Sequence, residues 1–68
     1  MNNVEVFVQS DYTVLVYNNE VLVGYLTECW NDYDDAMSYA ENVVLEFNGR
    51  VYYNDQLVFD TNAEYQHA

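Results

Sequence analysis

Positive charge is almost absent from this chain of 68 residues, which has a single arginine, Arg50, and no lysine against twelve acidic residues. Proteins that hold the backbone of a nucleic acid, or an anionic membrane surface, do so with lysine and arginine side chains. The formal net charge of −11 therefore excludes both as direct partners. Because 51% of the residues are hydrophobic, this charge does not imply disorder, which also requires low hydrophobicity. We expect a folded protein that keeps its negative charge despite self-repulsion.

Cysteine, glycine and histidine are too scarce for several kinds of functional site. Cys29 is the only cysteine, which excludes internal disulfides and cysteine-based metal sites. Its neighbour Glu28 does not favour a reactive thiolate, so we expect Cys29 to be a packing residue. Two glycines cannot form a phosphate-binding loop. His67, next to the last residue, is a poor candidate for a general base.

The densest acidic segment, Asp32-Tyr33-Asp34-Asp35, does not match a calcium-binding loop. A loop starting at Asp32 requires glycine at position 6 and glutamate at position 12, where the chain has Met37 and Val43. Only a weak, non-specific cation site would be compatible with this segment. A carboxylate pair for glycoside hydrolysis would lack a substrate cleft in so short a chain. The sequence therefore predicts that the protein is not an enzyme and that it has no cofactor and no metal site.

The length predicts one small acidic domain, residues 1–68, near the lower limit for a self-sufficient core. No apolar run approaches the roughly 20 residues of a membrane-spanning helix. The first residues also lack the basic region and apolar stretch of a secretory signal. We therefore expect a cytoplasmic protein, with residues 61–68 as a frayed tail.

Residues 4–27 have the composition and partial alternation of a three-stranded meander. Three segments are rich in β-branched and aromatic residues, namely Val4–Gln9, Tyr12–Tyr17 and Glu20–Thr27. Ser10-Asp11 and Asn18-Asn19 fit tight turns between them, since asparagine tolerates the left-handed conformation that a short hairpin requires. The second turn would place Leu15 opposite Leu22.

From Asp32 to about Asn48 the apolar residues recur at helical spacing. They form one stripe, made of Tyr33, Ala36, Met37, Ala40, Val43, Val44 and Phe47. Asn31 or Asp32 can cap the start of this helix, and Gly49 provides a stop. We expect Tyr33, Ala40, Val44 and Phe47 to be core residues.

The last part of the chain predicts a second hairpin, with strands Arg50–Tyr53 and Gln56–Asp60 around the turn Asn54-Asp55. The fold class is therefore α+β: a small antiparallel sheet in the order βββαββ, with one helix packed on one face.

The helix can cover only one face of this sheet, yet five large side chains are expected on the other, namely Phe7, Leu15, Tyr17, Leu22 and Leu26. An apolar second face on so small a domain is usually buried against something. We predict a homodimer in which Phe7, Leu15, Tyr17 and Leu22 form the interface. The alternative is that strand curvature folds this face into the same core.

Seven acidic residues are the candidate partner-binding residues. Asp32, Asp34, Asp35, Glu41 and Glu46 flank the apolar stripe of the helix, and Asp55 and Asp60 belong to the second hairpin. The simpler interpretation of each is a solvated surface residue. Solubility, however, requires only about 2–8 net charges with both signs mixed. Adaptation to high salt is another explanation for the excess.

Carboxylates on a helix at i and i+3 or i+4 lie about 5–6 Å apart, which is similar to the spacing of phosphates along one DNA strand. In size, charge excess and expected α+β fold, the chain resembles the small acidic phage-encoded DNA-mimic inhibitors. That resemblance implies a non-enzymatic inhibitor that competes with DNA for a basic host protein, such as a nucleoid protein of the HU type, a restriction enzyme, a CRISPR complex or RNA polymerase. It also implies a location at the host nucleoid through that partner. The alternative is an acidic inhibitor or adaptor whose basic partner does not bind DNA.

Overall fold

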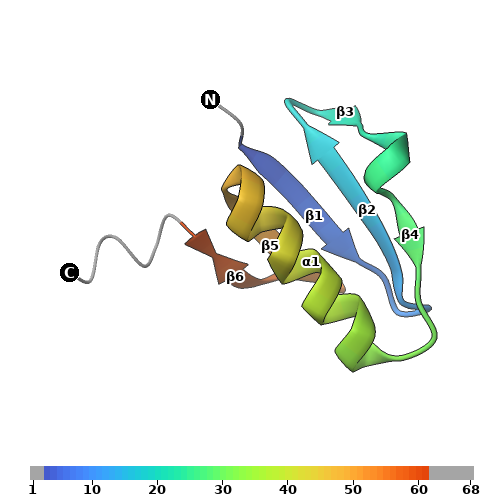
Figure 1. Cartoon of the computed structure of the whole chain (residues 1–68). Helices are drawn as coiled ribbons and strands as arrows, with labels where there is room; N and C mark the ends of the chain where they lie inside the picture. Colours follow the sequence, from blue (N-terminus) through green and yellow to red (C-terminus); the bar gives the residue numbers. More distant parts are fainter. Residues whose placement is uncertain (1–2, 62–68) are drawn as a thin grey trace.

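A computed structural model describes residues 3–61 of the chain as a β-sheet with one α-helix lying across it (Figure 1). The helix is α1 (Tyr33–Phe47), and a short 3-10 helix, η1 (Gly24–Leu26), precedes it. The strands are β1 (Val4–Val8), β2 (Thr13–Asn18), β3 (Val21–Leu22), β4 (Glu28–Cys29), β5 (Gly49–Tyr53) and β6 (Gln56–Asp60). The predicted α+β class is confirmed.

The sheet is mixed, whereas the sequence predicted an antiparallel one. The strand order is β3-β2-β1-β5-β6, with β4 as a further partner of β2, and β1 runs parallel to β5. The cause is the direction of α1, which carries the chain from the end of β4 back along the sheet. β5 therefore starts beside the start of β1, where Gly49 pairs with Val4. The antiparallel prediction was wrong for this central pair, because a crossover helix produces parallel neighbours.

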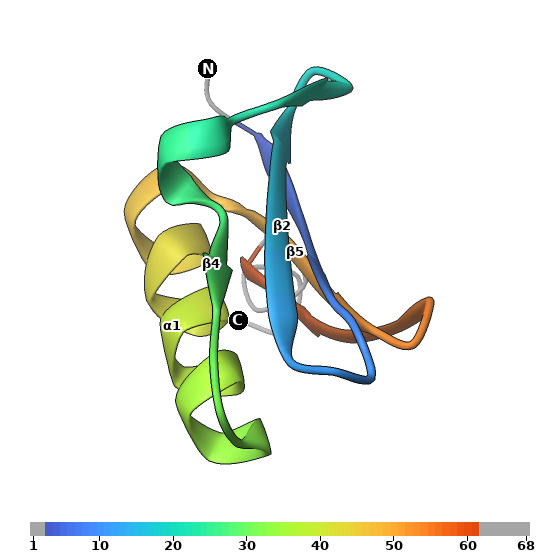
Figure 2. The same ribbon diagram turned by 90° about the vertical axis from the view of Figure 1, so that its right-hand side faces the viewer.

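The third predicted strand, residues 20–27, is divided into three elements along one edge of β2. β3 pairs with the end of β2, and β4 pairs with its beginning. Between them, η1 lies on the same side of the sheet as α1 (Figure 2). Leu26 belongs to η1 and packs against the core, so its expected position on the opposite sheet face was wrong.

The turn between β2 and β3 lies one residue later than predicted. It consists of Asn19 and Glu20, whose φ angles are 53° and 69°, while Asn18 remains in β2. Two consecutive positive φ angles are typical of the hairpin turn whose twist matches that of the strands. The register moves with the turn, so Leu22 faces Tyr17 instead of Leu15.

The second predicted hairpin is confirmed. β5 and β6 pair antiparallel around Asn54 and Asp55, whose φ angles are 50° and 67°. These φ angles are close to those of the turn between β2 and β3, and asparagine at the first position suits the left-handed region.

Valine side chains of the sheet form most of the core beneath the helix. The buried apolar residues are Val4, Val6, Val8, Val14, Val16 and Val51 of the sheet and Ala36, Met37, Ala40, Val43 and Val44 of α1. Full burial of one valine stabilises the fold by about 1.5–3 kcal/mol. Phe47 is half-buried against this cluster. Tyr33 is 43% exposed and packs edge-on against Tyr53, so its predicted place in the core was wrong.

Cys29 is exposed, contrary to the packing role expected for it. It lies in β4 at the sheet edge, where its Sγ atom is 3.6 Å from Oγ1 of Thr13. Thr13 of β2 is the pairing partner of Cys29. In the described strand order β4 has no neighbour on its other side, so Cys29 remains exposed at the edge of the sheet.

Asp32 caps the start of α1. Its Oδ1 accepts a hydrogen bond of 2.9 Å from the backbone N–H of Asp35. The helix ends at Asn48, which adopts a φ of 62°, rather than at the glycine that follows. Gly49 is instead the first residue of β5 and has no positive φ.

Asp32→Ala is expected to lower the free energy of unfolding by about 1 kcal/mol, because alanine cannot accept the capping hydrogen bond. Asp32→Asn should have a much smaller effect, since asparagine caps a helix as well as aspartate does. Urea unfolding followed by circular dichroism measures both variants. Equal stability of the alanine variant and the native protein would show that the cap contributes nothing.

Thr61, the first residue of the predicted tail, belongs to the folded structure. It is 6% exposed, and its Oγ1 accepts a hydrogen bond of 2.9 Å from the backbone N–H of Gly49. The same hydroxyl donates to the carbonyl oxygen of Gly49 at 3.3 Å. The rest of the predicted tail, residues 62–68, lies outside the described residues.

Candidate partner-binding surfaces

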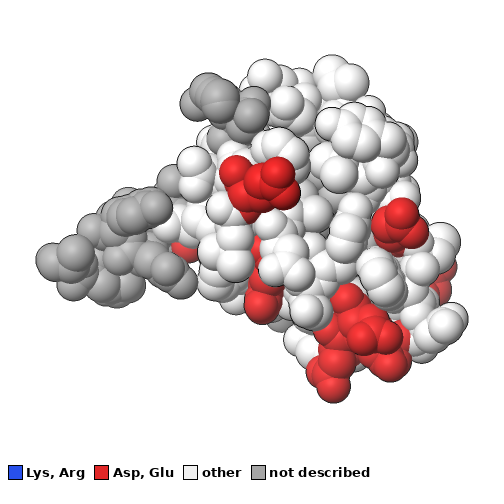
Figure 3. Space-filling view, viewed as in Figure 1, with Lys and Arg blue, Asp and Glu red and all other residues white. Residues whose placement is uncertain are grey.

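The first candidate surface is the start of α1. Asp32 caps the helix, and Asp34 and Asp35 lie exposed in its first turn. Figure 3 shows the largest group of acidic atoms on the helix side of the molecule over this end of α1. Acidic residues favour this end because the free backbone N–H groups of the first turn give it a partial positive charge. The structure therefore brings together three of the seven candidate residues.

Two further candidates lie farther along α1. Glu46 is exposed and Glu41 is half-buried. In Figure 3 the acidic atoms form separate patches rather than one continuous band, and no lysine or arginine is visible in this view. The helix side therefore has negative charge in several places, with neutral surface between them.

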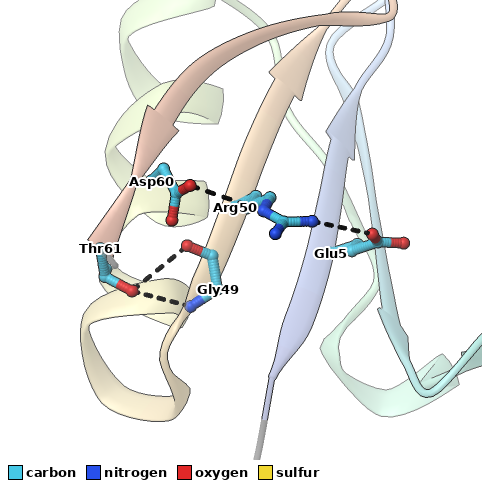
Figure 4. A network of polar contacts seen from close by, with 5 residues as sticks. All are labelled: Glu5, Gly49, Arg50, Asp60 and Thr61. Carbon is cyan, nitrogen blue, oxygen red and sulfur yellow. Dashed lines mark hydrogen bonds and ion pairs between the residues drawn. The ribbon is translucent and has the colours of Figure 1, made fainter. Parts of the chain in front are cut away.

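Asp60 differs from the other candidates because it contacts the only arginine of the sequence. Arg50 of β5 lies between two acidic residues, with its Nε 3.5 Å from Asp60 and its Nη1 3.8 Å from Glu5 of β1 (Figure 4). A hydrogen bond with Tyr52 is the main reason that the pKa of Arg50 is raised, and the charge of Asp60 adds to it. The cation is therefore neutralised within the sheet, and Asp60 is less available to a partner than the sequence suggested.

The sheet face opposite α1 is covered by no element formed by residues 3–61 (Figure 2). Phe7 lies in the middle of this face, stacked on Tyr52 with ring centroids 4.9 Å apart and edge-on to Tyr17 at 5.7 Å. Leu15 of β2, which pairs with Phe7, is half-buried, whereas Leu22 at the edge of the sheet is 48% exposed. The four residues predicted for a dimer interface therefore share one face, and the dimer itself stays a prediction.

This face is hollowed. The hollow has a volume of about 690 Å³, and Phe7, Leu15 and Tyr17 form its apolar floor. Its remaining lining comes from β1 and from the turns at the sheet ends: Glu5, Val8, Gln9, Ser10, Asp11, Glu20, Asn54 and Asp55. In Figure 2 these turns bend away from α1, toward the uncovered face.

Three acidic residues of the hollow come from three different turns: Asp11 after β1, Glu20 after β2 and Asp55 after β5. All three are exposed. The pKa of Asp11 is lowered, mainly because its carboxylate accepts a hydrogen bond from the backbone N–H of Thr13 at 3.1 Å. Asp11 is therefore ionised at neutral pH.

Of these three residues, only Asp55 was predicted from the sequence to contact a partner. Asp11 lay in a predicted turn, whereas Glu20 was predicted as the first residue of the strand that follows the turn Asn18-Asn19. Turns between neighbouring strands lie at the ends of a sheet, where their side chains surround whichever face is left open. That the two ends bend toward the same face depends on the curvature of the folded sheet.

Within residues 3–61, no group of three or more His, Cys, Asp and Glu side chains is placed to hold a metal ion. Among the helices of this part of the chain, none is long and apolar enough to cross a membrane. Comparisons with protein-family models, with curated proteins and with solved structures find no match.

Proposed function

We propose that this protein is a non-enzymatic DNA mimic, which occupies the DNA-binding surface of a basic host protein and competes with DNA for it. One observation carries the proposal: the single arginine is held by Glu5 and Asp60, so the acidic residues at the start of α1 have no neighbouring cation among the described residues. A partner rich in lysine and arginine would supply the missing charges. Such complementarity increases the rate of association and selects basic partners.

The contact residues proposed are Asp32, Asp34, Asp35, Glu41 and Glu46 of α1, together with Asp55 and, to a lesser extent, Asp60. The partner would be a small DNA-binding protein, such as a dimeric nucleoid protein of the HU type, and the protein would act at the nucleoid in the host cytoplasm. No direct contact with nucleic acid is proposed, because the net charge of −11 opposes it.

The second candidate function is that of an acidic inhibitor or adaptor whose basic partner does not bind DNA. The separation of the acidic atoms into patches favours this candidate, because a DNA strand presents its phosphates in a continuous row (Figure 3).

A competition experiment separates the two functions. A nucleoid protein of the HU type is bound to a labelled DNA duplex, and release of the DNA is followed by fluorescence anisotropy as the protein is added. The mimic should release the DNA, and its affinity should fall about tenfold or more between about 50 and 200 mM salt, because charges dominate such an interface. A captured partner that still binds DNA fully when saturated with this protein would contradict the mimic and support the adaptor.

Single neutralising substitutions test the contact residues. Asp34→Asn and Asp35→Asn are each expected to weaken the competition about threefold, since an exposed ion pair contributes up to about 1 kcal/mol. Glu28→Gln is the matched control, because Glu28 is exposed on β4 and its substitution changes the net charge equally. An equal loss in all three variants would show that total charge, and not the start of α1, determines binding.

The predicted homodimer through Phe7, Leu15, Tyr17 and Leu22 is a separate proposal, which the competition with DNA does not require. It is an alternative to any other partner on that sheet face, since Phe7, Leu15 and Tyr17 can be covered by only one of them. It would bury two faces that each have acidic turns at their edges. A monomer mass in analytical ultracentrifugation at micromolar concentration would exclude it.

A further inference from the structure

We propose that the hollow on the uncovered sheet face binds a positively charged segment of a partner protein, in which one large apolar side chain lies between lysine or arginine residues. This site is on the side of the sheet opposite α1, and the inference holds whether or not the partner binds DNA.

The floor of the hollow favours an apolar side chain. Phe7, Leu15 and Tyr17 line it, and the contacts of Phe7 with Tyr17 and Tyr52 hold the aromatic rings in place. A fixed aromatic floor loses little side-chain freedom when a ligand binds, which favours affinity. The volume of about 690 Å³ is within the range of sites that take a small ligand or a few side chains.

The acidic residues around the hollow favour positive charge at both ends of the bound segment. Val8 of β1 pairs with Tyr53 of β5, so the turns that contain Asp11 and Asp55 lie at the same end of the sheet. Glu20 follows β2 and lies at the opposite end, since Val4 pairs with Asn18 there. A strand of five residues is about 17 Å long. An extended segment of about five to seven residues would therefore reach both ends.

Charge complementarity also distinguishes this occupant from a second copy of the chain. A second copy would bring a net charge of −11, with its own Asp11, Glu20 and Asp55 facing those of the first. The single cation Arg50 compensates little of this charge, and it is already paired with Glu5 and Asp60. A partner segment with lysine or arginine on both sides of its apolar residue would pack on the apolar floor and pair with the acidic rim, which consists of Asp11, Glu20 and Asp55.

The test uses a synthetic peptide of seven residues, with a central phenylalanine between two pairs of arginines. It is titrated into the ¹⁵N-labelled full chain and followed by two-dimensional NMR. The amide signals of Phe7, Leu15, Tyr17 and the turns around Asp11 and Asp55 should shift, and those of α1 should not. The same peptide with serine in place of phenylalanine should bind at least about tenfold more weakly, because it buries no large apolar side chain.

Matched substitutions test the floor and the rim separately. Glu20→Gln combined with Asp55→Asn should weaken binding about tenfold, whereas Asp34→Asn combined with Asp35→Asn, which changes the net charge equally, should change it less than about twofold. Leu15→Ser should weaken binding, and Leu45→Ser on the exposed side of α1, where Leu45 is 63% exposed, serves as its control. Circular dichroism verifies that each variant is folded.

Three results would overturn the inference. The serine peptide could bind as tightly as the phenylalanine peptide, which would mean that only total charge is recognised. The shifted signals could lie in α1 instead of the uncovered face. Finally, ultracentrifugation could detect a dimer that Leu15→Ser dissociates, which would assign the hollow to a second copy of the chain.

Discussion

Gly49→Ala is expected to lower the free energy of unfolding by about 3 kcal/mol or more, because there is no space for a methyl group at this position. A Cβ atom on Gly49 would lie 2.0 Å from the carbonyl oxygen of Val4 and 2.8 Å from its carbonyl carbon and its Cγ2. Two of these three atoms belong to the backbone of β1, so no side-chain rotation relieves the overlap. The strands could make room only by separating where β1 and β5 begin to pair.

Gly24→Ala is the matched control for this substitution. A Cβ atom on Gly24 has no heavy atom within 4 Å, and the residue has no positive φ. Alanine there should leave stability unchanged or raise it by up to about 1 kcal/mol, because it restricts the unfolded chain. Urea unfolding of both variants, followed by circular dichroism, measures the difference. A Gly49→Ala variant as stable as the native protein would contradict the close parallel pairing of β1 with β5.

Thr61→Val is expected to cost about 1–3 kcal/mol, because it leaves the buried backbone N–H of Gly49 without its acceptor. The threonine hydroxyl accepts from this N–H at 2.9 Å and donates to the carbonyl oxygen of the same residue at 3.3 Å (Figure 4). Valine has nearly the same shape, so the loss of stability reports the hydrogen bonds and not a change in packing. The hydroxyl thereby attaches the residue after β6 to the start of β5.

Thr61→Ser distinguishes the contribution of the hydroxyl to stability from that of the methyl group. Serine keeps the donor and the acceptor, so most of the stability lost in Thr61→Val should be retained in this variant. Thermal and urea unfolding of the two variants measure the contribution of the hydroxyl. If serine and valine destabilise the protein equally, packing of the threonine methyl group, and not hydrogen bonding, holds this residue in place.

The helix, strands and turns that are specified by residues close together in the sequence were predictable from it. The apolar stripe from Ala36 to Val44 defines α1, and the alternation of valines in β1 and β2 identifies the face that α1 covers. The hairpin around Asn54 and Asp55 was predicted with its correct turn, since asparagine suits the left-handed conformation found there. In each case the signal lies within a few residues of the structure that it specifies.

The pairing of distant segments was not predictable in the same way. No local pattern shows that Gly49 lies against Val4, because α1 and the segments before it separate the two residues in sequence. The glycine appeared to be a helix stop, while Asn48 performs that role with a φ of 62°. Its importance comes instead from the close approach of two strands.

The composition of the candidate sites was likewise visible in the sequence, and their geometry was not. The scarcity of lysine and arginine established the negative charge, and the helix pattern placed Asp34 and Asp35 together in one exposed turn. That Arg50 lies between Glu5 and Asp60 depends on strand order, because the three residues lie on three adjacent strands.

By itself, the sequence determined the charge of this protein, its α+β class, the extent of its helix and the valine face of its sheet. These properties follow from residue type and local periodicity. Only the tertiary structure decided the parallel pair at the centre of the sheet, the pairing of Arg50 and the hollow surrounded by Asp11, Glu20 and Asp55. Each of these brings together residues that are far apart in the chain, and their positions follow from sheet order and curvature rather than from the neighbours of any one residue.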